Sequence, residues 1–153
     1  MAPHKQLIAH DPEHGFWGDC WRTCIACLLE IHPAEVPNFA AGGDQAKADV
    51  ECRTWLKTRG YNLVRFCMNA DFDFSRVAAD WFDDTLYILC GASPNIAGVA
   101  HCVIGRGAFE VVWDVARSEA GLAGPWVDEN GNRVYWIEFI VPSRLAGEQR
   151  EAA

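Results

Sequence analysis

The order of secondary-structure patterns along the chain constrains its fold more than any other feature. In the first half, apolar residues recur at helical spacing over residues 20–30 and 45–59. In the second half, short apolar runs bounded by Gly, Pro, Asn or Asp are typical of strands. Because helices and strands are largely segregated, we predict an α+β fold in which N-terminal helices pack on a largely antiparallel β-sheet.

Capping and breaking residues set the bounds of these elements. Asp19 and Asp44 are suitable N-caps for the first two helices, while Pro33 and Gly60 follow their ends. The predicted helices cover residues 20–30, 45–59 and 73–82, and the predicted strands cover 61–68, 86–90, 101–105, 109–116 and 134–141. The strands at 101–105 and 109–116 are joined by a short turn and form a predicted hairpin.

Length and hydropathy indicate a single folded unit. The chain has 153 residues, half of them apolar, which is enough for one domain with a hydrophobic core. We assign residues 1–142 to this domain. Residues 143–153 are mostly small or polar, and we expect a frayed C-terminal tail.

Charge and cysteine usage narrow the classes of partner. The formal net charge is -8, which argues against nucleic acid and anionic membranes as partners, because both are bound through clustered Lys and Arg. No secretion signal and no apolar run of about 20 residues is evident. The 7 cysteines are an odd number at uneven spacing, which is typical of reduced thiols. We therefore expect a cytoplasmic protein.

Cys20 is the strongest candidate for a catalytic nucleophile. It follows Gly18 and Asp19 and begins the first predicted helix. Only a thiolate is a good nucleophile, and the free N–H groups and dipole at a helix N-terminus stabilise its negative charge. The same N–H groups can bind the oxyanion that forms when a thiolate attacks a carbonyl carbon.

His101 and Asp114 supply a candidate base and a candidate orienting acid. His101 begins a strand after the small-residue loop 91–100, and Asp114 lies near the end of the next strand. A hairpin would bring both to the same end of the sheet, where Asp114 could fix the imidazole tautomer. Asn95 is the alternative orienting residue.

Two segments resemble the papain-like cysteine peptidase superfamily, and within it the C39-like and small phage or bacterial peptidase-like proteins. They read GDCWRTCIACLLEI at 18–31 and HCVIGRGAFEVVWDVA at 101–116. The resemblance implies a papain-like fold and a Cys20, His101 and Asp114 triad. It implies a hydrolase of the thiol protease type, acting through a thioester on a peptide, isopeptide or amide bond of a peptide or protein. It implies no cofactor and no metal.

The resemblance also implies an oxyanion-binding side chain upstream of the nucleophile. Gln6 lies farther upstream than is usual in the superfamily, and His10 is the alternative. Trp17, Asp19 and Trp21 surround Cys20 in sequence and are candidates for the substrate groove, although core packing is an equally ordinary role for Trp21. The loops 32–44, 91–100 and 116–126 are expected to shape the groove.

Other functions compete with this hypothesis. The chain could be a catalytically silent papain-like module that binds or inhibits a target. Cys20, Cys24 and Cys27 also spell the spacing of the iron–sulfur motif in radical SAM enzymes, although they fall on a predicted apolar helix. A zinc site that adds His32 or Cys52 to these cysteines lacks the paired spacing of zinc-binding motifs.

Overall fold

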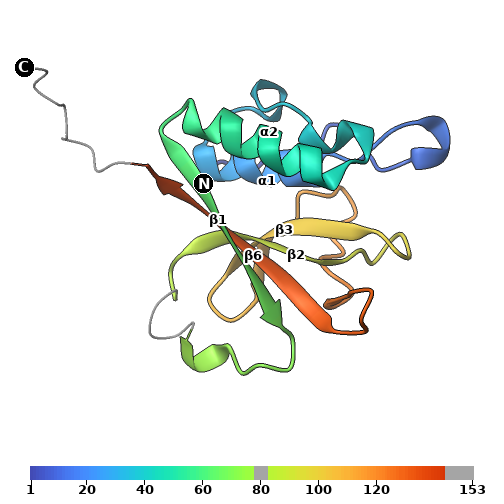
Figure 1. Cartoon of the computed structure of the whole chain (residues 1–153), viewed down its shortest axis with the longest axis vertical. Coiled ribbons are helices and arrows are strands. Elements are labelled where there is room, and N and C mark those ends of the chain that lie inside the picture. The colour runs from blue at the N-terminus through green and yellow to red at the C-terminus, as the bar shows by residue number, and fades with distance from the viewer. Residues whose placement is uncertain (78–82, 144–153) are drawn as a thin grey trace, which may run out of the picture.

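A six-stranded antiparallel sheet carries the two main helices on one face (Figure 1). The structure is a computed structural model, and it describes residues 1–77 and 83–143. Helix α1 spans Cys20–Leu29 and helix α2 spans Gln45–Lys57, and 3-10 turns occur at Pro12–His14 (η1), Pro33–Glu35 (η2) and Phe39–Gly42 (η3). The strands are β1 (Tyr61–Asn69), β2 (Leu86–Ala92), β3 (Ala100–Arg106), β4 (Glu110–Trp113), β5 (Trp126–Val127) and β6 (Arg133–Pro142). The predicted α+β class with an antiparallel sheet is confirmed.

The last strand lies in the middle of the sheet. The strand order is β1-β6-β2-β3-β4, and β5 also pairs with β6. Strand β6 runs against the whole of β1, from Tyr61 opposite Pro142 to Asn69 opposite Val134. The long pairing of β1 with β6 is visible in Figure 1 as the crossing green and red strands. The last strand of the sequence therefore lies between β1 and β2, which come earlier in the chain.

Alternation along the central strands divides the apolar side chains between two cores. On β2 and β3, Ile88, Cys90, Cys102 and Ile104 face the core under the helices, where they meet the inward face of α1. The residues between them join a second core on the opposite face, together with Phe74. Helix α1 is thereby held against β2 and β3, so that its first residue comes to lie beside the N-terminal end of β3.

Several element predictions need correction. Strand β4 ends at Trp113, so that residues 114–116 form a loop rather than strand, and a register shift between Ile104 and Gly105 interrupts the pairing there. Strand β5 was not predicted, because two residues are too few for a periodic pattern. Of the predicted helix 73–82, residues 75–77 are helical and residues 78–82 lie outside the described part of the chain.

The predicted tail, 143–153, is described only at its first residue. Ser143 donates its backbone N–H to the carbonyl of Gly60 over 2.7 Å, which ties the end of β6 to the start of β1. Residues 144–153 lie outside the described part.

Candidate active site

Cys20 is the first residue of α1, is half-buried and lines a pocket. Its position places it among the unpaired N–H groups at the start of a ten-residue helix. The pKa of Cys20 lies well below that of an ordinary thiol. A hydrogen bond from the Cys102 side chain is the largest cause; burial opposes the shift, and a hydrogen bond and the charge of His101 add to it. Cys20 is therefore a thiolate where most thiols are protonated.

His101 and Asp114 form a buried hydrogen-bonded pair. His101 Nε2 lies 2.8 Å from Asp114 Oδ1, and both side chains are almost fully covered. The ring also interacts with Cys20, because each of the two groups shifts the pKa of the other. Because Nε2 is bound to Asp114, Nδ1 is the ring nitrogen left for the Cys20 sulfur. The three side chains are therefore neighbours in the order thiol, imidazole and carboxylate.

The acid is held by the backbone that follows it. Asp114 Oδ1 accepts the N–H of Ala116 over 2.8 Å, and Oδ2 accepts the N–H of Gly121 over 2.9 Å. Burial raises the pKa of Asp114, but the hydrogen bonds from His101 and from these two N–H groups outweigh it, so its pKa is lowered. Asp114 therefore stays ionised and fixes the imidazole.

The same contacts make His101 a strong base. Burial alone would lower the pKa of His101, but the hydrogen bonds to Asp114 and Cys20 and their negative charges raise it to about 9. At neutral pH these shifts favour a thiolate on Cys20 and an imidazolium on His101.

An N-terminal strap, residues 4–8, connects helix α1 with the loop that begins at Asp114. On the acid side, Lys5 Nζ donates to the carbonyls of Asp114 and Ala116 over 2.8 Å and 3.1 Å, and the Gln6 N–H donates to the carbonyl of Val115 over 2.9 Å. The ammonium of Lys5 also lies 4.2 Å from the ring centroid of Trp113. The strap therefore positions Asp114 from outside the sheet.

On the nucleophile side, the strap is held by Asp19. The backbone N–H groups of Leu7 and Ile8 donate to the Asp19 carboxylate over 3.2 Å and 3.0 Å, and Arg22 Nε donates to it over 2.9 Å. Asp19 occupies the N-cap position of α1, but its side chain makes no capping hydrogen bond, contrary to the sequence prediction. Asp19 is also buried and is not among the residues that line the pocket, unlike Trp17 and Trp21, the other two groove candidates.

We expect Asp19→Ala to destabilise the protein by about 3 kcal/mol, because it leaves a nearly buried guanidinium and two strap N–H groups without their partner. The Asp19 side chain is 0% exposed and the Arg22 side chain is 11% exposed, so the loss of stability should exceed that for a surface ion pair. Urea unfolding measures the change. Glu119→Ala, which removes an exposed partner of Lys5, is the control and should cost less than about 1 kcal/mol. Equal costs for the two variants would contradict this role of Asp19.

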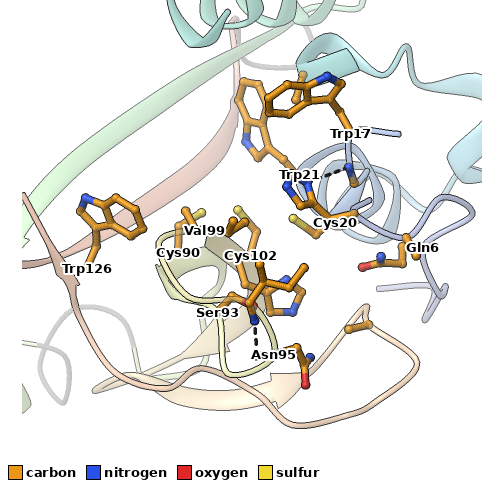
Figure 2. Close-up of a pocket in the computed structure, with 18 of the residues that line it drawn as sticks. Gln6, Trp17, Cys20, Trp21, Cys90, Ser93, Asn95, Val99, Cys102 and Trp126 are labelled. Carbon is orange, nitrogen blue, oxygen red and sulfur yellow. Dashed lines mark hydrogen bonds between the residues drawn. The ribbon is translucent and has the colours of Figure 1, made fainter. Parts of the chain in front are cut away.

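The pocket above Cys20 has a volume of about 840 Å³. Residues from all three predicted loops line it. They are Ala40 from the loop 32–44, then Ser93, Asn95, Ile96 and Val99 from the loop 91–100, and Arg117, Ser118 and Trp126 from the loop 116–126. Figure 2 shows Trp126 on one side of Cys20 and Cys102, with Gln6 on the other side and Trp17 at the upper rim. Trp17 and Trp21 both line the pocket, and Trp21 is at the same time part of the core.

Backbone hydrogen bonds join two of the pocket loops. The Ala92 N–H donates to the Gly124 carbonyl and the Ala123 N–H donates to the Ala92 carbonyl, each over 2.9 Å. Gly91 is required here, because a Cβ at this position would lie 2.5 Å from the Gly124 oxygen. Asn95 Nδ2 donates to the Ser118 hydroxyl over 3.0 Å, so Asn95 joins the loops and does not contact His101 as an orienting residue.

The two candidate oxyanion residues, Gln6 and His10, both line the pocket. Gln6 Nε2 donates one N–H to the Ile8 carbonyl over 3.0 Å, which leaves its second amide N–H. His10 Nδ1 accepts the Gly18 N–H over 3.2 Å, and the His10 ring packs edge-on against Trp17. His10 therefore holds the loop that precedes the nucleophile, whereas Gln6 keeps a donor for the pocket.

Sequence reasoning missed an ionic network in the pocket wall. Glu138, on β6, accepts from Trp21 Nε1 over 2.6 Å and from Arg65 Nε over 2.6 Å, while Arg65 makes a bidentate contact with Asp49. Glu138 is 2% exposed, and burial raises its pKa. The only signal in the sequence was a glutamate at an inward position of an apolar strand.

The cysteines of the competing iron–sulfur and zinc hypotheses are distributed between a helix start and the core. Cys20, Cys24 and Cys27 all belong to α1, and Cys24 and Cys27 are fully buried in the core. Among the described residues, no group of His, Cys, Asp and Glu is arranged to hold a metal ion. All 7 cysteines are free thiols. None of the described helices has the length and hydropathy needed to cross a membrane.

Comparisons of the chain with protein-family models, with curated proteins and with solved structures found no match.

Proposed function

We propose that this protein is a thiol-dependent hydrolase of papain-like fold that cleaves a peptide, isopeptide or amide bond. The observation that carries the proposal is that Cys20 and His101 line one large pocket and lower and raise each other's pKa, while His101 is hydrogen-bonded to Asp114. A nucleophile, a base and an orienting acid in this arrangement are the parts that nucleophilic catalysis of acyl transfer requires.

In the proposed reaction, the Cys20 thiolate attacks the substrate carbonyl carbon. The backbone N–H groups at the start of α1, with the second amide N–H of Gln6, donate to the oxyanion. When the tetrahedral intermediate collapses, the His101 imidazolium protonates the leaving amine and a thioester remains on Cys20. Neutral His101 then takes a proton from water, which attacks the thioester and releases the acid. Asp114 keeps Nδ1 of the ring directed at the reacting atoms throughout.

The papain-like part of the proposal draws on the arrangement of the elements as well as on the motifs. The nucleophile begins a helix that packs on an antiparallel sheet, and the base and acid come from the following hairpin in the order Cys, His, Asp. The pocket is mostly apolar with tryptophans on several sides, which suits a peptide with bulky side chains as substrate.

The test is the pH dependence of Cys20 alkylation by iodoacetamide, read site by site with mass spectrometry. Because the pKa of Cys20 is lowered well below that of an ordinary thiol, Cys20 should be alkylated faster at pH 5 than the other cysteines of the chain. In His101→Ala, Cys20 should react at least about tenfold more slowly at pH 5, because the loss of ionised fraction exceeds the gain in nucleophilicity per thiolate.

Cys67 is an exposed cysteine outside the pocket and serves as the internal control in both proteins. If Cys20 is alkylated no faster than Cys67 at pH 5, the proposed function is wrong.

Hydrolysis needs the His101 imidazolium as well as the Cys20 thiolate. We therefore expect the hydrolytic activity to fall as the pH rises through about 9, where His101 loses its proton.

A further inference from the structure

Two buried thiols in the pocket wall have no part in the proposed hydrolysis. Cys90 and Cys102 lie directly opposite each other on β2 and β3, and both line the pocket together with Cys20. Figure 2 shows Cys102 between Cys90 and Cys20. A nucleophilic thiolate with a second thiol next to it is the arrangement that thiol–disulfide chemistry uses.

Cys102 is the thiol that lies beside the nucleophile. Figure 2 shows its side chain next to that of Cys20, all three cysteines line the same pocket, and Cys90 is its cross-strand partner. Cys90 and Cys102 are buried, whereas Cys20 is half-buried and faces the pocket. A small oxidant that enters the pocket therefore meets the ionised sulfur of Cys20 first.

We propose that Cys102 is a resolving thiol that captures oxidised Cys20 in a reversible disulfide. The proposal rests on the proposed function, since it requires the activated Cys20 thiolate. The proposed modification site is the pair Cys20 and Cys102, and the oxidant is a hydroperoxide small enough to enter the pocket.

Two steps form the disulfide. In the first, the Cys20 thiolate attacks one oxygen of the hydroperoxide; the O–O bond breaks, and Cys20 becomes a sulfenic acid. The sulfur loses two electrons and the peroxide gains them, and the departing oxygen leaves as water or an alcohol with a proton from the His101 imidazolium. In the second, the Cys102 sulfur attacks the Cys20 sulfur, an S–S bond forms and the S–O bond breaks. The departing hydroxide combines with the Cys102 proton and leaves as water.

The contacts also explain the order of the two steps. The pKa of Cys102 is raised well above its ordinary value, chiefly because its proton is held in a hydrogen bond to Cys20, with Cys90 and burial adding to the shift. Oxidation to a neutral sulfenic acid removes the negative charge that holds this proton. Cys102 is thus inert beside the thiolate and becomes a better nucleophile once Cys20 is oxidised.

The experiment treats the full chain with hydrogen peroxide, blocks the remaining thiols under denaturing conditions and maps disulfides by peptide mass spectrometry. We expect a Cys20–Cys102 disulfide in the wild type, and dithiothreitol should restore iodoacetamide labelling of Cys20. In Cys102→Ser, Cys20 should remain a sulfenic acid, trapped several-fold more by dimedone, and then proceed to sulfinic acid. Cys90→Ser is the matched control, because Cys90 lies opposite Cys102 in the same wall, and it should keep the disulfide.

Wild-type protein that proceeds to sulfinic acid, or that joins Cys20 to Cys90, would overturn the proposal. Circular dichroism checks that the variants fold, and the disulfide map of the wild type decides the matter without them. The same samples separate the two hypotheses. Fast alkylation of Cys20 at pH 5 without a Cys20–Cys102 disulfide overturns the resolving role alone, whereas slow alkylation of untreated Cys20 overturns the proposed function itself.

Discussion

Cys20→Ala is expected to slow acyl-enzyme formation from a small activated ester, such as p-nitrophenyl acetate, by at least about 10³-fold. The proposed reaction forms a thioester on this sulfur, and the neighbouring thiol, Cys102, has a pKa raised well above its ordinary value, whereas that of Cys20 is lowered. The wild type should release a burst of nitrophenolate that matches the enzyme concentration, and intact-mass measurement should find one acetyl group on Cys20.

Cys24→Ala is the matched control. Cys24 lies one turn further along α1, is fully buried and does not line the pocket. Burial raises its pKa well above the ordinary value, with the charge of Cys20 adding to the shift, so it is an inert thiol. The control should keep the burst and lose no more than about 1 kcal/mol of stability, because only a small group is removed from the core. A Cys20→Ala variant that still shows a stoichiometric burst would remove Cys20 from the mechanism.

Glu138→Ala is expected to lower the free energy of unfolding by about 3–5 kcal/mol. The carboxylate is 2% exposed and bonded to Arg65 and Trp21, so its loss leaves a partly buried guanidinium and an indole N–H without an acceptor. Trp21 follows Cys20 directly and lines the pocket, and its release from Glu138 should disturb the pocket wall as well. Urea unfolding with intrinsic tryptophan fluorescence measures both the stability and the change around Trp21.

Asp49→Ala tests the same network from its exposed side. Asp49 is 24% exposed and bonded to the same Arg65, which keeps Glu138 in this variant. A cost of about 1–2 kcal/mol is expected, because solvent can replace the lost carboxylate. If Glu138→Ala cost no more than Asp49→Ala, burial would not be the reason for the strength of the Glu138 contacts.

Local patterns in the sequence were sufficient for most of the fold. Helix α1 begins at Cys20 and helix α2 at Gln45 as predicted, because apolar periodicity and the residues that bound it act within a few positions. The side chain of Asp44 caps α2 by accepting from the Lys47 N–H. Strand bounds also agree closely for β1, β2, β3 and β6. Asp114 lies past the end of β4 and still reaches His101, since a hairpin brings residues on either side of its turn together.

The sequence by itself determined that Cys20 begins a helix and that His101 and Asp114 lie near one end of a hairpin, because each depends on neighbours close in the chain. Only the tertiary structure decided which side chains surround them. Asp19 turns to the strap and not to its own helix, Glu138 meets Trp21 across 117 residues, and Cys102 comes to lie against the sulfur of Cys20. These partners belong to segments far apart in sequence that meet only when α1 packs on the sheet. Where two such segments pack together, the direction of each side chain depends on packing and strand register, which no local sequence pattern encodes.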